Sequence, residues 1–426
     1  MKTRKSPLSR YTLNTITALH GEIRLTNALT YNSCLNRYSL PTGAREIQTM
    51  STFNGIVYEY PQIRVDRFEP TGKTCKHYFL SHCHTDHMEG LDRYRNDIFS
   101  SGGVKLYGSP ITVRILKNTY PDLKNNVKEL SVECPEMVRV NEKGDCVMVT
   151  TIPAGHCPGS VMFLFEGSHT VLYTGDFRIN VADLPKYVHL HRNGKTKRLD
   201  NLYLDTTFCH EKYEHFPSRA ESANALCELV EMWLNLHEDN TVFLKIPAYF
   251  GCEYLFVDLF GKLSRHIHVL PKMHELYKYV PELARVITLD HSRARIHASL
   301  KMVPCCSFAN ESRFLRTIYI SALSWDHYVP GKRPVRKLSS AYESYGVCCS
   351  QHSSLSEIVG FVRYLRPDRI EPCVVPVDCE ESCVMVETLE RLMKEFKSKE
   401  GETLSGTNEN CREKKIRRYS ESTSFL

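Results

Sequence analysis

The stretch Ser81-His-Cys-His-Thr-Asp-His87 largely decides the fold of this 426-residue chain. It directly follows the apolar run Tyr78-Phe-Leu80, which predicts a buried strand. His82 and His84 are two residues apart, so they project to one side of an extended segment. Three imidazoles and a carboxylate within six residues are typical of a site for one or two divalent cations such as zinc or manganese. An ordinary polar loop is the alternative, and it would leave this concentration of ligands unexplained.

Two later residues complete a plausible ligand set. His156 lies in Pro153-Ala-Gly-His-Cys-Pro-Gly159, where glycines and prolines predict a fixed loop after a strand. Asp176 follows the strand predicted at Val171–Thr174, and a carboxylate at such a strand end can bridge two cations. Each residue taken alone is equally consistent with an ordinary loop position.

Strand-like and helical segments alternate along the chain and predict an α/β fold without internal repeats. The predicted helices cover Arg219–Leu236, Glu253–Leu263, Ser356–Leu365 and Glu381–Lys397, and Ser218 with Glu221 predicts a capping box. The predicted strands are His77–Ser81, Val104–Tyr107, Val147–Pro153, Val161–Phe165, Val171–Thr174, Leu202–Asp205, Val242–Ile246, Thr317–Ile320 and Cys373–Val377.

Composition excludes some classes of protein. No run approaches the ~18 consecutive apolar residues of a membrane span. The 17 cysteines include no Cys-x-x-Cys pair, which favours a reducing compartment over a disulfide framework. Most of the net charge of +6 falls in residues 1–49, so bulk charge does not indicate a nucleic-acid surface.

The two ends differ in composition from the rest of the chain. Residues 1–49 are expected to be a flexible basic extension; a transit peptide is an alternative, as is a start at Met50. Residues 401–426 are expected to be a disordered tail, in which the run Arg412–Arg418 is either a nuclear address or a solvated end.

Four longer motifs carry a family resemblance. They are Phe79-Leu-Ser-His-Cys-His-Thr-Asp-His-Met-Glu-Gly-Leu91, Pro153-Ala-Gly-His-Cys-Pro-Gly-Ser-Val-Met-Phe-Leu-Phe165, Leu172-Tyr-Thr-Gly-Asp-Phe-Arg178 and Leu204-Asp-Thr-Thr-Phe208. Together they resemble the metallo-β-lactamase superfamily and, within it, the β-CASP DNA nucleases. The resemblance covers about residues 50–400. It implies an αββα sandwich formed by residues 50–205 and 352–400, interrupted by a β-CASP cap domain at residues 206–351.

The resemblance also implies roles for individual residues. A first ion, Zn²⁺, would bind His82, His84, His156 and Asp176, and a second, Mg²⁺ or Mn²⁺ (or Zn²⁺), would bind Asp86, His87 and Asp176. The catalytic residues would be Asp86, Asp205 and His352, with Asp66 orienting ligands from behind. Ser350, Ser353 and Gly251 are candidate phosphate contacts. Val374 occupies a position where RNA-processing members tend to carry His, which favours DNA.

The match departs from the family at an additional zinc site. Related nucleases use two His and two Cys there, and His268 and His297 align with the histidines. Ser299 replaces one cysteine, so Cys305 and Cys306 would both be needed to rebuild the site. A pair of core histidines is an equally good interpretation.

The function implied is a metal-dependent DNA endonuclease acting on hairpins, overhangs and single-strand junctions, with 5′-3′ exonuclease activity as an addition. End processing in double-strand break repair by non-homologous end joining, in the nucleus, would be its role. DNA is the expected partner, with a DNA-repair kinase or ligase complex as a protein partner and no membrane. The alternatives are an RNA-processing endonuclease of the same fold, a small-molecule hydrolase and an inactive DNA-end-binding scaffold.

Overall fold

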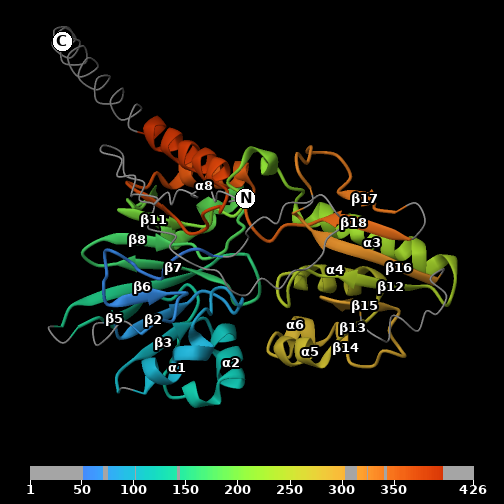
Figure 1. The fold of residues 1–426 in the computed structure, drawn as a ribbon, viewed down its shortest axis with the longest axis horizontal. Helices are drawn as coiled ribbons and strands as arrows, with labels where there is room; N and C mark the ends of the chain where they lie inside the picture. The colour runs from blue at the N-terminus through green and yellow to red at the C-terminus, as the bar shows by residue number, and fades with distance from the viewer. Residues whose placement is uncertain are drawn as a thin grey trace, which may run out of the picture.

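The chain forms two lobes that lie side by side (Figure 1). The computed structural model describes residues 51–70, 75–100, 102–141, 144–302, 314–323, 325–339 and 343–396. The first lobe is built from both ends of the described chain, and the second from its middle. None of the described helices is both long enough and apolar enough to cross a membrane.

Two sheets form the first lobe. The four-stranded sheet is parallel throughout, in the order β1 (Ile63–Val65), β2 (His77–Leu80), β3 (Lys105–Gly108), β4 (Val127–Glu129). The six-stranded sheet has the order β19 (Ile370–Pro372), β11 (Asn201–Leu204), β8 (Thr170–Tyr173), β7 (Val161–Glu166), β6 (Cys146–Pro153), β5 (Glu136–Arg139). It is antiparallel from β5 to β8 and parallel from β8 to β19. A small ribbon joins β9 (His191–Arg192) to β10 (Lys195–Thr196).

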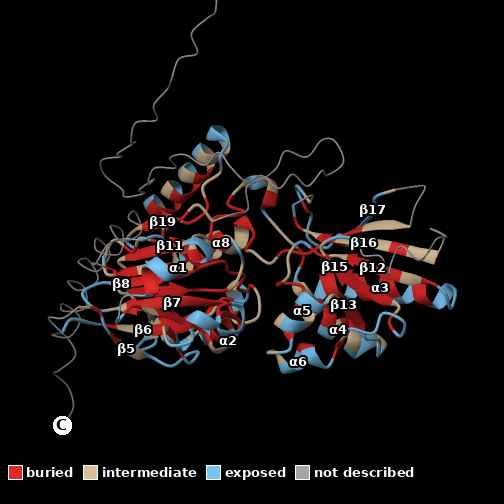
Figure 2. Cartoon of the chain, turned by 60° about the horizontal axis from the view of Figure 1, so that its bottom comes forward, coloured by how far each residue is buried: buried red, intermediate tan, exposed pale blue. Residues whose placement is uncertain are grey.

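The two sheets pack face to face because their strands are apolar on both sides. Along β7, Phe163 and Phe165 enter the core between the sheets, whereas Met162 and Leu164 face the helices outside. Helix α8 (Leu355–Leu365) and the helix at residues 379–396 cover that outer side. Helices α1 (Leu91–Phe99) and α2 (Pro110–Thr119) cover the four-stranded sheet. The lobe is therefore an αββα sandwich, with its central strands fully buried (Figure 2).

The second lobe has one seven-stranded sheet. Its order is β14 (Ile287–Thr288), β13 (Ile267–Val269), β15 (Ile296–Ser299), β12 (Thr241–Lys245), β16 (Leu315–Ser321), β18 (Ser344–Cys348), β17 (Val335–Lys337), and only β17 runs antiparallel. The apolar core of this lobe packs the sheet against α3 (Arg219–Leu236), α4 (Glu253–Leu263), α5 (Pro271–Tyr277) and α6 (Pro281–Ala284).

Most elements predicted from the sequence are present. Helices α3 and α4 have the predicted bounds, and Ser218 and Glu221 form the predicted capping box. The strand predicted at Cys373–Val377 is wrong, because the paired strand is β19, which ends at Pro372. Val374 lies just beyond it, and its backbone bonds to the Thr206 hydroxyl rather than to a neighbouring strand.

Candidate metal centre

Loops at one edge of the first lobe carry the candidate site. His82, His84, Asp86 and His87 follow β2, His156 lies between β6 and β7, and Asp176 follows β8. Asp205 follows β11, while His352 arrives from the second lobe after β18. The carboxyl end of β2, from the four-stranded sheet, meets here with the carboxyl ends of the parallel pair β8 and β11, from the six-stranded sheet. Ligands of α/β sheets usually bind at such strand ends. The loop that carries Asp176 packs closely against Ser81, the residue before His82. A Cβ on Gly175 (φ +52°) would lie 2.8 Å from the Ser81 side chain.

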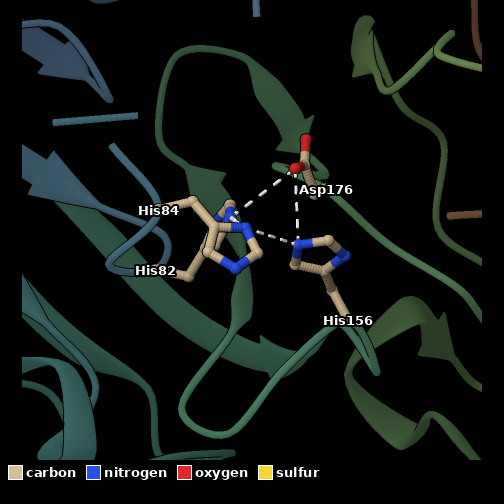
Figure 3. A group of neighbouring side chains, drawn as sticks. All are labelled: His82, His84, His156 and Asp176. Atoms are coloured by element: carbon tan, nitrogen blue, oxygen red, sulfur yellow. Dashed lines mark hydrogen bonds and ion pairs between the residues drawn. The ribbon is translucent and has the colours of Figure 1, made fainter. Parts of the chain in front are cut away.

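Three imidazoles and one carboxylate converge at the centre of this edge (Figure 3). Nδ1 of His84 lies 3.1 Å from Nε2 of His82 and 3.0 Å from Nε2 of His156. Oδ2 of Asp176 lies 3.5 Å from His82 Nε2 and 3.4 Å from His156 Nε2. A tetrahedron with metal–nitrogen bonds of ~2.0–2.1 Å has edges of about 3.3 Å. The four separations are close to this edge length, and all four atoms lie within 4.8 Å of one another, so one cation could contact them all.

The far nitrogens of these rings have partners that fix their tautomers. His84 Nε2 donates to the Phe250 carbonyl at 3.3 Å, and His156 Nδ1 donates to the Gln351 carbonyl at 3.0 Å. His82 Nδ1 lies 2.9 Å from the Ser81 hydroxyl. Each ring therefore turns the lone pair of its other nitrogen toward the same point, an arrangement that only a proton or a cation makes favourable.

Burial keeps two of these rings neutral. Burial, followed by the neighbouring His82, lowers the pKa of His84 to about 3. Burial also lowers the pKa of His156 well below its ordinary value, against the opposing charge of Asp176. Neutral imidazole is the form that binds a metal ion, so the protonation state suits a ligand.

A second group of possible ligands shares Asp176 with the first. Oδ1 of Asp176 lies 3.1 Å from His87 Nε2, and Oδ2 of Asp86 lies 3.6 Å from the same nitrogen. This buried Nε2 has no hydrogen bond of acceptable geometry. Burial lowers the pKa of His87, but Asp176, Asp86 and Asp66 outweigh it and hold the pKa well above the ordinary value. One carboxylate thus faces both clusters, one oxygen to each.

Asp66 lies behind both clusters as a saturated acceptor. Its Oδ1 accepts from the Ser81 backbone at 2.7 Å. Its Oδ2 accepts from the Ser81 hydroxyl at 2.5 Å, from His87 Nδ1 at 2.7 Å and from Tyr173 at 2.9 Å. The residue adopts φ +54°, an uncommon conformation that Asp tolerates better than most. With its oxygens so engaged, Asp66 is placed to orient ligands rather than to bind a cation itself.

Asp205 and His352 form an acid–base pair beside the cluster. His352 Nδ1 lies 2.9 Å from Asp205 Oδ2, while its Nε2 lies 3.8 Å from Asp176 Oδ2. Burial lowers the pKa of His352, but Asp205 and then Asp176 outweigh it and raise the pKa to about 9. Asp205 is itself fixed by the backbone and hydroxyl of Thr207, at 3.0 and 2.6 Å.

The donors of the expected phosphate contacts have partners within the protein in this structure. The Ser350 hydroxyl donates to the His352 carbonyl at 2.7 Å, and that of Ser353 donates to the Phe177 carbonyl at 3.0 Å. Each hydroxyl has one proton, which is already engaged. The Gly251 N–H is likewise engaged, since it donates to Glu253 Oε2 at 2.6 Å.

The additional zinc site is only partly described. His268 and His297 lie side by side, buried, with their Nδ1 atoms 3.1 Å apart. Burial, followed by His268, lowers the pKa of His297 to about 4. Cys305 and Cys306 lie outside the described residues.

Several residues that support the cluster were not anticipated from the sequence. Ser81 and Tyr173 flank predicted ligands, so an inspection of neighbouring hydroxyl groups would have found them. Phe250 and Gln351 act through backbone carbonyls, for which the sequence gives no signal.

Known proteins are similar to this chain in sequence. Residues 281–378 match the family described as DNA repair metallo-beta-lactamase. Protein artemis from Gallus gallus is 38% identical over 368 residues, covering 82% of this chain and 51% of that protein. Protein artemis from Homo sapiens is 34% identical, covering 82% and 53%. The chain belongs to the DNA-repair metallo-β-lactamase family. The resemblance to β-CASP DNA nucleases and the predicted fold class are therefore confirmed.

A third relative in this family has an activity in its name. The 5′ exonuclease Apollo from Rattus norvegicus is 33% identical over 336 residues, covering 77% of this chain and 56% of that protein. The chain thus spans about half the length of the curated relatives it matches. Among solved structures, a protein of unknown function from Enterococcus faecalis V583 aligns over 72% of this chain and 77% of that chain. Its TM-score of 0.41 and 16% identity are too low to bear on function.

Proposed function

We propose that this chain is a metal-dependent nuclease that hydrolyses phosphodiester bonds in DNA. The observation that carries the proposal is Asp176, whose two oxygens face two separate clusters of possible ligands, with the Asp205–His352 pair alongside. Paired metal sites of this kind serve in-line displacement at phosphorus. Membership of the DNA-repair metallo-β-lactamase family supports the same chemistry.

The donor sets fit two different cations. His82, His84, His156 and Asp176 would hold Zn²⁺, because three imidazoles and a carboxylate suit this borderline ion. Asp86, His87 and Asp176 would hold a second ion, Mg²⁺ or Mn²⁺ (or Zn²⁺), with fewer protein ligands and more room for substrate oxygens. The buried Nε2 of His87 supports this second site, because it faces Asp176 Oδ1 at 3.1 Å and Asp86 Oδ2 at 3.6 Å, so that the three groups could share one cation.

The chain's own residues supply the remaining steps. When bound, the ions would lower the pKa of water and offset charge on the phosphoryl oxygens. Asp205 accepts from Nδ1 of His352 and so holds the ring with Nε2 toward the cluster. From that position the protonated ring can deliver its Nε2 proton to the departing alkoxide. Asp86 and Asp176 would help to orient the attacking oxygen.

The proposed substrate is DNA with hairpins, overhangs or single-strand junctions, cut endonucleolytically and from 5′ ends. The name of the 5′ exonuclease Apollo supports the exonuclease activity. The role would be end processing by non-homologous end joining in the nucleus, together with a DNA-repair kinase or ligase complex. The Val374 backbone bonds to the hydroxyl of Thr206, the residue after Asp205 in the sequence. An imidazole at position 374 could add a ligand, whereas an isopropyl group cannot, and this favours DNA.

We also propose domain boundaries. Residues 50–205 and 352–400 would form the metallo-β-lactamase domain, and residues 206–351 the β-CASP domain. The seven-stranded sheet, which lies within residues 241–348, supports this division. Residues 1–49 and 401–426 would be extensions outside both domains.

A cleavage assay with the full chain tests the function. Wild-type protein with Mn²⁺ or Mg²⁺ should nick a DNA hairpin, and His84→Ala should abolish nicking. His266→Ala, which changes an exposed histidine remote from the cluster in sequence, should cleave normally. Unchanged cleavage by His84→Ala would refute the active site. Preferential cleavage of a matched RNA strand would instead establish the RNA-processing alternative.

A further inference from the structure

One ligand of the proposed metal site is held by the other lobe. The loop between β12 and α4 reaches from the second lobe to His84, where the Phe250 carbonyl accepts from Nε2 at 3.3 Å. The Phe250 ring lies 6.2 Å from the imidazole, centroid to centroid. Because this carbonyl requires the proton to be on Nε2, it leaves Nδ1 as the atom that faces the cluster. The position of one backbone carbonyl therefore sets the tautomer of a ligand.

The carbonyl is placed by an unusual backbone turn. Gly251 adopts φ +114°, and a Cβ there would overlap the side-chain amide of Gln351. Its N–H donates to Glu253 Oε2 at 2.6 Å. On the other side of Phe250, the Tyr249 carbonyl accepts from the Tyr277 hydroxyl at 2.6 Å. The Phe250 carbonyl and the Gly251 N–H belong to one peptide group, which Glu253 thus anchors directly, while Tyr277 anchors the peptide group before it.

The burial of the Glu253 carboxyl costs free energy that packing alone does not explain. Only 6% of it is exposed, and its Oε1 has no hydrogen-bond partner. The titratable groups that face it are Cys157, Cys252 and Tyr277, none of them cationic. Burial raises the pKa of its carboxyl to about 7. A buried carboxyl with no opposite charge destabilises the fold, which favours a functional reason for its presence.

We propose that Glu253 is a positioning residue which, by accepting from Gly251 N–H, fixes the Phe250 carbonyl and thereby the tautomer and orientation of His84. This inference rests on the metal site proposed above and adds to it a determinant in the other lobe. It concerns the acceptor atom of Glu253 and not its charge. A glutamine at position 253 should therefore retain the positioning role of Glu253, and an alanine should not.

The test measures metal affinity and the His84 tautomer separately from activity. Zn²⁺ affinity is measured by chelator competition, and the ¹⁵N shifts of the histidine rings are measured in metal-free protein. Glu253→Ala should weaken Zn²⁺ binding about tenfold, the lower end of the effect of removing an outer ligand partner. It should also shift the His84 nitrogens toward a mixture of tautomers, while Glu253→Gln should retain the wild-type affinity and shifts.

Two further variants keep the test decisive. Asn240→Ala removes a buried side chain at the opposite end of β12, which donates to the Trp233 carbonyl at 2.8 Å. It should destabilise the same lobe without changing Zn²⁺ affinity. If Glu253→Ala does not fold, Gly251→Ala perturbs the same turn and should weaken Zn²⁺ binding in the same way.

The failures of the inference and of the metal site can be told apart. Wild-type affinity and tautomer in Glu253→Ala, with affinity lost in His84→Ala, would overturn the positioning role alone. Affinity as low in Glu253→Gln as in Glu253→Ala would also overturn it. Unchanged affinity in His84→Ala would overturn the metal site itself and the inference with it.

Discussion

Glu253 should make the protein less stable as pH rises, and Glu253→Gln should remove that dependence. Burial raises the pKa of Glu253 from an ordinary 4.5 to about 7. Between these values the folded state keeps a proton that the unfolded state has released. Stability therefore falls with rising pH through this window and reaches its full loss above pH 7. A glutamine keeps the Gly251 hydrogen bond but does not titrate.

The size of the effect follows from the two pKa values. Each pKa unit between folded and unfolded states corresponds to about 1.4 kcal/mol. Linkage then gives a cost of roughly 1 kcal/mol at pH 5 and roughly 3 kcal/mol at pH 8. The free energy of unfolding of Glu253→Gln, relative to wild type, should thus rise by about 2 kcal/mol between pH 5 and pH 8.

Urea unfolding of metal-free protein, followed by tryptophan fluorescence, measures this difference. Both tryptophans, Trp233 and Trp325, belong to the lobe that contains Glu253, so the signal reports the relevant unit. Glu343→Gln is the control, because burial raises the pKa of Glu343 but its bond to Arg316 outweighs this and lowers it. That variant should be destabilised by a constant amount from pH 5 to pH 8. Equal pH dependence in wild type and Glu253→Gln would refute the reasoning.

Three other changes test the remaining parts of the site and fold. Asp176→Asn should lower the metal content of both sites, measured by elemental analysis, because each carboxylate oxygen faces a different cluster; an unchanged content would contradict a shared ligand. Asp205→Asn should lower kcat by ~10²-fold or more while Zn²⁺ affinity remains, since Asp205 orients and charges His352 and is not one of the four proposed zinc ligands. Phe163→Ala, at a fully buried position between the two sheets, should cost about 3–5 kcal/mol in urea unfolding, and a cost below 1 kcal/mol would contradict the assigned core.

The sequence predicted much of the cluster because its information is local. His82, His84, Asp86 and His87 lie within one loop, and their residue types already indicate a cation. Their geometry follows from the strand before them, whose apolar run predicts a buried β2. Helices α3 and α4 were predicted with correct ends because α3 begins with a capping box and both have long apolar faces.

The wrong strand prediction occurs where the structure depends on distant partners. The Cys373–Val377 segment has strand-like residues, but the pairing of this part of the chain with β11 ends at Pro372, and the backbone of Val374 bonds to the Thr206 hydroxyl. Ser350 and Ser353 remain predicted phosphate contacts, and in the structure their hydroxyls donate to nearby carbonyls. Residue type alone cannot show whether a hydroxyl is already engaged.

Backbone carbonyls from outside the first lobe's sheets complete the proposed site, which explains why sequence motifs understate the role of the second lobe. His84 and His156 belong to family motifs, but Phe250 and Gln351 hold them through carbonyl groups that any residue type would provide. What restricts the sequence is the geometry around those carbonyls: a glycine at φ +114° and a buried carboxyl that accepts from it. His352 also arrives at the site directly from β18 of the second lobe. A movement between the lobes would therefore change the carbonyl partners of His84 and His156.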